Sequence, residues 1–336
     1  CKKLADVDKD HRTKASVAVL ADKILAPINS GCVSPESSLR VADFIQNFYL
    51  PQAAKSLRPS TVKDYAYIFE DHLRRRLGEI SLRDFRTVIG QRLMASINGV
   101  GHKRLLRIKS FLSGVFTHAK REGILDGENP MRGVSVQGRP TRPKMPVYEI
   151  SEIEEMLTAL PEPAHTVVAV AAFTGLRVSE LRGLRWEDFD GESLHVRRSV
   201  WRRHVGATKT PESEASVPVL PFLKKALEKH RNWKSDGSYI FAGEKFGAPL
   251  NLANLARRVI KPAIKAKGVE WKGWHAFRRG LASNLYALGV QPKVIQAILR
   301  HSDIGTTLAY YVATPDEESR AALRKIENSF VPWTLL

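Results

Sequence analysis

The sequence predicts a mainly α-helical protein with one small β-sheet, built as an all-helical domain followed by a mixed α+β domain. Apolar residues recur at helical spacing over most of residues 39–130, whereas residues 193–201 alternate apolar and polar side chains as a strand does. Residues 133–146 are proline-spaced, basic and without periodicity, which is typical of a linker. A chain of 336 residues is long enough for two domains, each with its own core.

Residues 1–38 form a separate N-terminal segment. Val17, Leu20, Ile24 and Ile28 repeat at helical spacing, so we expect one helix here, followed by a loop over residues 31–38. A single helix cannot bury its own apolar face. We therefore expect it to pack against another domain or against a partner.

The region 39–132 is expected to hold four helices. Proline, a capping residue or glycine marks several of their ends. The helices are predicted over residues 41–50 with a stop near Pro51, over 60–77 with Ser60 or Thr61 as the cap, over 82–97 and over 102–121.

Cations crowd the first turns of the fourth of these helices and recur in the linker. A helix N-terminus disfavours positive charge, and a bound phosphate would remove the conflict. For any one of these residues a solvated charged face is an equally good interpretation. The candidate DNA-binding residues are Lys103, Arg104, Arg107 and Lys109 on the helix, and Arg139, Arg142 and Lys144 in the linker.

The region 147–336 is predicted to be mixed. Residues 193–201 and 216–220 are expected to form a hairpin with Lys209 in its connecting loop, and residues 238–242 a third strand. Helices are expected from Ser151 with Glu154 as a capping box, over 165–173 up to Gly175, and over 251–266, 274–288, 292–299, 304–311 and 316–330.

The composition points to a polyanionic partner. Lys and Arg number 53 against 35 Asp and Glu, a formal charge of +18, in a chain that is 43% hydrophobic and therefore folded. A basic protein without a nucleic-acid role remains an alternative on charge alone. Cys1 and Cys32 lie far from any His or Cys cluster, so we expect no zinc site, no disulfide framework and a reducing, cytoplasmic location. No apolar run is long enough to span a membrane.

Six polar residues in the second half of the chain together suit attack on a phosphodiester without a metal. Arginine binds phosphate oxygens in pairs, lysine and histidine transfer protons, and tyrosine can act as a covalent nucleophile. Taken singly, each also fits a structural or surface role, and a nearby Glu180 fits an ion pair with the first arginine. The six candidates are Arg177, Lys209, His275, Arg278, His301 and Tyr310.

The order and surroundings of these residues resemble the tyrosine site-specific recombinases, the phage integrase family. The string T-G-L-R-V-S-E-L-R-G-L-R-W-E-D is similar to the first arginine box of that family, and L-R-H-S-D-I-G-T-T-L-A-Y to its third box. In the third box the nucleophile falls nine positions after the histidine, which selects Tyr310 over Tyr311. The P-S-T-V-K-D-Y string extends the resemblance into the helical region, so it covers about residues 40–330.

Two positions depart from the family pattern. The second box is H-A-F-R-R-G where H-D-L-R-H-T is common, so Ala276 replaces an acid. Arg300 stands before the third-box histidine, where glycine is frequent. Neither departure removes a catalytic group, and Arg300 is expected to alter activity or to add a DNA contact.

The resemblance implies an architecture and a set of partners. Residues 39–132 would be a helical, SAM-like core-binding domain and 147–336 the catalytic domain, while residues 1–38 would lead from a missing arm-binding domain. The expected partner is double-stranded DNA carrying specific sites, bound by a homo-oligomer, a tetramer on paired sites. The protein is expected to be bacterial or phage-encoded, to act at the nucleoid in the cytoplasm, and to have no membrane partner.

It also implies a reaction. The enzyme would cut and rejoin DNA through a 3′-phosphotyrosine without metal, ATP or other cofactor, and so integrate or excise a mobile element. Arg177 and Arg278 would clamp the phosphate, Lys209 protonate the leaving oxygen, and His275 take the proton of Tyr310. His301 would hydrogen-bond the phosphate or support Tyr310, and Glu180 would orient its neighbours. The alternatives are a type IB topoisomerase and a sequence-specific DNA-binding protein that has lost the reaction.

Overall fold

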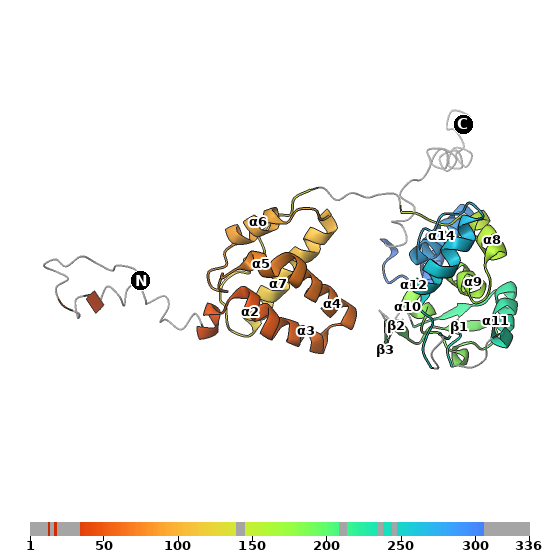
Figure 1. Cartoon of the computed structure of the whole chain (residues 1–336), viewed down its shortest axis with the longest axis horizontal. Coiled ribbons are helices and arrows are strands. Elements are labelled where there is room, and N and C mark those ends of the chain that lie inside the picture. Colours follow the sequence, from red (N-terminus) through yellow and green to blue (C-terminus); the bar gives the residue numbers. More distant parts are fainter. Residues whose placement is uncertain are drawn as a thin grey trace, which may run out of the picture. The chain divides into compact units, whose positions relative to one another are not determined.

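The computed structural model describes residues 13, 17–18, 34–138, 145–207, 214–233, 238–243 and 247–305. The chain divides into two compact units, Cys1–Pro143 and Lys144–Leu336 (Figure 1). The first unit is helical, and the second combines helices with two small antiparallel sheets, which confirms the predicted fold class. Most of the helix expected within residues 1–38 lies outside the described residues.

The first long helix of the helical unit runs through Pro51. A short turn, η1 (Pro35–Ser38), leads into α2 (Val41–Phe44), η2 (Ile45–Tyr49) and α3 (Leu50–Ser56), which follow one another without a break. The prediction that Pro51 ends this helix is therefore wrong. In η2 the N–H of Leu50 donates to the carbonyl of Ile45, five residues back. Such a wide π-turn lets the chain pass a proline that lacks an N–H and would crowd a regular turn.

The second long helix begins at Pro59. The helix comprises α4 (Pro59–Ile68), η3 (Phe69–Leu73) and α5 (Arg74–Leu77), and the flanking Arg58 makes no side-chain cap. Ser60 and Thr61 are therefore inside the helix, and the predicted cap is wrong. Proline suits the first helical position because its φ is already helical and its missing N–H would have no partner there.

The remaining helices of this unit enclose its core. They are α6 (Thr87–Ser96), which starts five residues later than expected, and α7 (His102–Arg121), which has the predicted bounds. The inner side of α7 is fully buried at Phe111, Leu112, Val115 and Phe116.

The beginning of the expected linker packs on this helical unit. Val134 is buried in the core, and the side chain of Gln91 bonds both the N–H and the hydroxyl of Ser135. His102 Nδ1 lies 2.9 Å from the carbonyl of Gln137. Residues 139–144, which hold the three basic linker candidates, lie outside the described residues.

The second unit surrounds one apolar helix, α9 (Ala164–Thr174), most of whose residues are buried. It contacts four other helices, which are α8 (Ile150–Ala159), α10 (Val178–Leu181), α11 (Pro221–Trp233) and α14 (Trp274–Ala287). It ends as predicted at Gly175, whose φ of 62° is left-handed. The helices are α8 (Ile150–Ala159), α9 (Ala164–Thr174), α10 (Val178–Leu181), η4 (Trp186–Asp188), α11 (Pro221–Trp233), α12 (Leu252–Leu255), η6 (Ala256–Ile260), α13 (Lys261–Lys265), α14 (Trp274–Ala287) and α15 (Pro292–Leu299).

The cap of α8 differs from the expected one. Glu152, at the third position of the helix, accepts a hydrogen bond from the N–H of Glu149 at 2.9 Å. The reciprocal box therefore begins two residues before the predicted pair, Ser151 and Glu154.

The strands pair in two separate sheets. In one, β1 (Ser193–His195) pairs antiparallel with β4 (Ser216–Pro218), which confirms the predicted hairpin partners. In the other, β2 (Ser199–Trp201) pairs with β3 (His204–Gly206), which the sequence did not predict. The single strand expected over 193–201 is broken because Arg198 turns toward the buried Asp188. Residues 238–242 form isolated bridges instead of a third strand.

Candidate active site

The turn between α9 and α10 presents Arg177. Its side chain is about one-quarter exposed, whereas Glu180, three residues later, is 1% exposed. Arg177 Nη1 donates to Glu180 Oε1 at 2.7 Å, and the Arg177 N–H donates to Oε2 at 2.9 Å. The buried carboxylate therefore holds both the backbone and the guanidinium of Arg177, as the spacing predicted.

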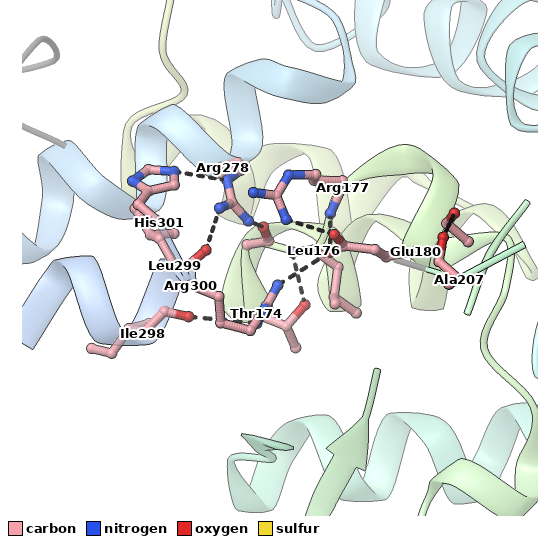
Figure 2. A network of polar contacts seen from close by, with 12 residues as sticks. Thr174, Leu176, Arg177, Glu180, Ala207, Arg278, Ile298, Leu299, Arg300 and His301 are labelled. Atoms are coloured by element: carbon pink, nitrogen blue, oxygen red, sulfur yellow. Dashed lines mark hydrogen bonds and ion pairs between the residues drawn. The ribbon is translucent and has the colours of Figure 1, made fainter. Parts of the chain in front are cut away.

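Arg278 comes from the buried face of α14 and meets the same turn. It is 5% exposed, and its Nη1 donates to the carbonyl of Gly175 at 2.6 Å. Its Nη2 donates to the carbonyl of Leu299, at the end of α15, and its Nε donates to Nε2 of His301 at 3.2 Å. Figure 2 shows the guanidinium of Arg278 between His301 and Arg177. One side chain thus joins three segments that are far apart in the sequence.

His301 is held in its neutral form. Burial, followed by the charges of Arg278, Arg177 and Arg300, lowers the pKa of His301 to about 4. Because Nε2 accepts from Arg278, the neutral ring carries its proton on Nδ1.

His275 lies on the first turn of α14 and is more exposed. Partial burial and the charges of Arg279, Arg278 and Arg177 lower its pKa below the ordinary value. A neutral imidazole beside cations is able to accept a proton, which is the role proposed for it. The charges of Arg177 and Arg278 thus reach both histidines.

Arg300 joins this cluster. It ends α15 with a left-handed φ of 54° and ψ of 49°, and it is 5% exposed. Its Nη2 lies 3.2 Å from Glu180 Oε2, so the carboxylate is shared between two arginines (Figure 2). Burial alone would raise the pKa of Glu180, but the bonds from Arg177 and the charge of Arg300 hold it below its ordinary value. The sequence singled out Arg300 without indicating this partner, which is 120 residues away.

The sequence did not single out Arg182, a further arginine with a structural role near the site. Arg182 donates through Nη1 to the carbonyl of Val200 and through Nη2 to that of Arg202, at 3.2 and 2.8 Å. Its Nε donates to the carbonyl of Leu250 at 3.2 Å. These bonds fasten the β2–β3 hairpin to α10. Nothing in the sequence distinguishes Arg182 from the other arginines of the first box.

Several predicted site residues lie outside the described part of the chain. The structure brings together Arg177, Glu180, Arg278 and His301, with His275 on the same helix as Arg278. Outside the described residues are Lys209, Tyr310, Arg139, Arg142, Lys144 and the predicted helices after residue 305.

The basic residues of α7 have an acidic partner within the protein. Arg104 Nη1 and Arg107 Nε lie 2.5 and 3.0 Å from the two carboxylate oxygens of Asp64 on α4. Asp64 therefore relieves part of the unfavourable charge at this helix N-terminus, a conflict that a bound phosphate was also expected to be able to remove. Lys103 is exposed and Lys109 half-buried.

Two further properties follow from the described residues. No group of three or more His, Cys, Asp or Glu side chains among them could hold a metal ion. Within the same residues, no helix is both long enough and apolar enough to cross a membrane.

Comparison with known proteins identifies the family of this chain. The model of the phage integrase family matches residues 147–318, just over half of the chain. The chain belongs to this family: it is a tyrosine site-specific recombinase, an enzyme that breaks and rejoins DNA strands. It is 24% identical, over 95% of its length and 91% of the relative, to a XerC-like tyrosine recombinase of Caldanaerobacter subterraneus subsp. tengcongensis.

Two solved structures share the fold. The integrase of the Tn1549 transposon, in complex with transposon right end DNA, has a TM-score of 0.71 and 19% identity, covering 86% of this chain and 100% of that one. A lambda integrase tetramer bound to a Holliday junction has a TM-score of 0.63 and 19% identity, covering 90% and 88%.

Proposed function

We propose that this recombinase cuts DNA by transesterification, with Tyr310 as the nucleophile and a 3′-phosphotyrosine as the intermediate. The observation that carries the proposal is the convergence of Arg177, Arg278 and His301, which are fastened by Glu180 and by two backbone carbonyls. Two guanidiniums held without freedom to reorient form a preorganised site for a phosphate that gains charge in the transition state.

In the first step, strand cleavage, each polar residue has its own role. The Tyr310 oxygen attacks phosphorus, the P–O bond to the 5′-oxygen breaks, and Arg177 and Arg278 stabilise the non-bridging oxygens. His275 accepts the phenolic proton, for which its lowered pKa and exposed position suit it. Lys209 donates a proton to the leaving 5′-oxygen.

The reverse of this step rejoins the strands. A free 5′-hydroxyl attacks the phosphotyrosine and releases Tyr310. The ester preserves the energy of the broken bond, so the cycle needs neither ATP nor a metal ion. His301, neutral and hydrogen-bonded to Arg278, fixes that arginine, and its Nδ1 carries the ring proton.

We further propose that the protein acts as a tetramer on paired sites and moves a mobile element. The lambda integrase tetramer on a Holliday junction and the Tn1549 integrase on transposon DNA support this assembly and this role by analogy of fold. The formal charge of +18 provides the general attraction to DNA, so binding should weaken steeply with salt.

The direct test is covalent trapping on a suicide substrate whose cleaved strand cannot be rejoined. Wild-type protein should accumulate a protein–DNA adduct, Tyr310→Phe should form none, and Tyr311→Phe should behave like wild type. An adduct with Tyr310→Phe would refute the assignment of the nucleophile. Arg177→Ala should abolish adduct formation while preserving most DNA binding.

A supercoil-relaxation assay separates the competing enzyme class. Relaxation of a plasmid that lacks any recombination site would favour a type IB topoisomerase. Recombination that requires two copies of one site supports the recombinase.

A further inference from the structure

Arg300 occupies a backbone position that disfavours any side chain. Its φ of 54° is in the left-handed region, where glycine is the favoured residue at the end of a helix. The backbone N–H donates to the carbonyls of Ala297 and Gln296, and glycine would form the same bonds without strain. The reason for an arginine here must therefore lie in its side chain.

Within the described part of the chain, the Arg300 side chain has one ionic partner, Glu180. Its Nη2 contacts Glu180 Oε2 at 3.2 Å, while its Nη1 is 3.5 Å from the carbonyl of Ile298. Its Nε is buried and has no hydrogen-bond partner among the residues that the structure describes. With 3% of the side chain exposed, the cation has lost its hydration, and the Glu180 carboxylate is what compensates for this loss.

Glu180 is therefore divided between two cations that have different surroundings. The side chain of Arg177 is 23% exposed and that of Arg300 is 3% exposed, and Figure 2 shows both arginines in contact with the Glu180 carboxylate. If Glu180 paired with Arg177 alone, its negative charge would cancel most of the positive field that Arg177 offers to a phosphate. A second, buried cation on the same carboxylate restores that field, since buried charges are poorly screened.

We propose that Arg300 is a positioning residue of the recombinase site: it shares Glu180 with Arg177, fixes the carboxylate, and preserves the positive charge that Arg177 presents to the scissile phosphate. The inference rests on the proposed function of Arg177. It assigns to this chain a third arginine that acts on the reaction without touching the DNA.

Single-turnover cleavage of the suicide substrate at saturating protein tests the role of the charge. Arg300→Gln should slow adduct formation by about tenfold or more, the size expected when a preorganised electrostatic contribution is lost. Arg300→Lys, which keeps the charge, should stay within about threefold of wild type. The DNA dissociation constant, measured separately, should change little for both variants.

Arg300→Gly separates the charge from the backbone strain. The melting temperature of Arg300→Gly should be no lower than that of Arg300→Gln, because glycine relieves the left-handed φ. Its rate of cleavage should nevertheless be as low as that of Arg300→Gln. Arg202 has the same φ of 54°, so Arg202→Gly provides a melting control for relief of strain outside this cluster. If Arg300→Gln cleaves within about twofold of wild type, or if Arg300→Lys is as slow as Arg300→Gln, the proposal is wrong.

A second readout does not depend on cleavage. The charged groups that act on His301 are Arg278, Arg177 and Arg300, so NMR titration of the His301 ring should give a higher pKa in Arg300→Gln and an unchanged one in Arg300→Lys. Absence of any wild-type adduct would refute the proposed function alone. In that case an unchanged His301 pKa in Arg300→Gln would also overturn the placement of the Arg300 charge, and a raised pKa would support it.

Discussion

The carbonyl of Gly175 accepts a hydrogen bond from Arg278 in the turn that leads to Arg177, and replacement of Gly175 by alanine should destabilise the second unit. A Cβ at this position would lie 2.7 Å from Leu299 Cδ2 and 3.1 Å from Leu281 Cδ2. Leu299 is fully buried against Ala282 and Ile295, so it has little room to move. The left-handed φ of 62° adds backbone strain that glycine avoids.

The magnitude follows from these two contributions. A non-glycine residue in the left-handed region costs about 1–2 kcal/mol. Overpacking of a buried contact costs about 1–3 kcal/mol more. The free energy of unfolding should therefore fall by about 2–5 kcal/mol, which for a unit of this size lowers the melting temperature by about 5–15 °C.

Calorimetry of wild type, Gly175→Ala and a matched control tests this estimate. Gly268 lies in the same unit with a φ of 75°, and a Cβ there would meet nothing within 4 Å, so Gly268→Ala reports the backbone strain alone. The second expectation is slower cleavage by Gly175→Ala, because the Gly175 carbonyl holds Arg278. If the two alanine variants melt together, the close approach of Leu299 contributes nothing and the reasoning fails.

Three further predictions concern charged groups. The pKa of His301 is about 4 in the folded protein against an ordinary 6.5, so the unfolded state binds the proton first as the pH falls. The free energy of unfolding should therefore fall by about 3 kcal/mol between pH 6.5 and pH 4. His301→Asn should flatten this pH dependence in a series of denaturant unfolding curves, and an unchanged pH dependence would contradict the prediction. Asp64→Asn should lower the free energy of unfolding by at most about 1 kcal/mol, because its pair with Arg104 is about one-third exposed. The same change should tighten DNA binding in a salt titration, and weaker binding would count against a DNA-facing α7. Arg198→Met should cost about 1.5–3 kcal/mol in urea unfolding, since the buried carboxylate of Asp188 loses its closer cation and keeps only Arg197, at 3.7 Å. A loss below about 1 kcal/mol would show that Arg197 is sufficient.

The helical parts of the fold were predictable where apolar periodicity and end signals agree. The helix α7, with buried residues recurring along one side, and the helix α15, bounded by Pro292 and by the L-R-H string, have the predicted bounds. Errors arose at prolines. Proline at residue 51 predicts the end of a helix, but the wide π-turn before it lets the helix continue, and the apolar periodicity of the sequence does not reveal that turn.

The strands, unlike these helices, could be predicted only in part from the sequence pattern. Alternation over 193–201 predicted one strand, and the structure divides it because Arg198 is drawn to Asp188 and Gly183 is pressed against the Arg198 backbone. A period of two residues cannot report such a contact, since it depends on segments brought together by the fold. The β2–β3 hairpin was missed for the same reason: its turn is fastened by Arg182 from α10.

The sequence by itself determined the family, the two-part architecture and the chemical identity of the candidate site residues. The family follows from the resemblance of the sequence boxes. The architecture follows from apolar periodicity, since a helix encodes its own period, and the candidate residues follow from the functional groups that phosphate chemistry needs. Only the tertiary structure decided that Arg278 bridges Gly175, Leu299 and His301, and that Arg300 and Arg177 both bind the Glu180 carboxylate. Two of those contacts, Arg278–Gly175 and Arg300–Glu180, join residues 103 and 120 positions apart, and their strength comes from burial, which a linear sequence does not contain.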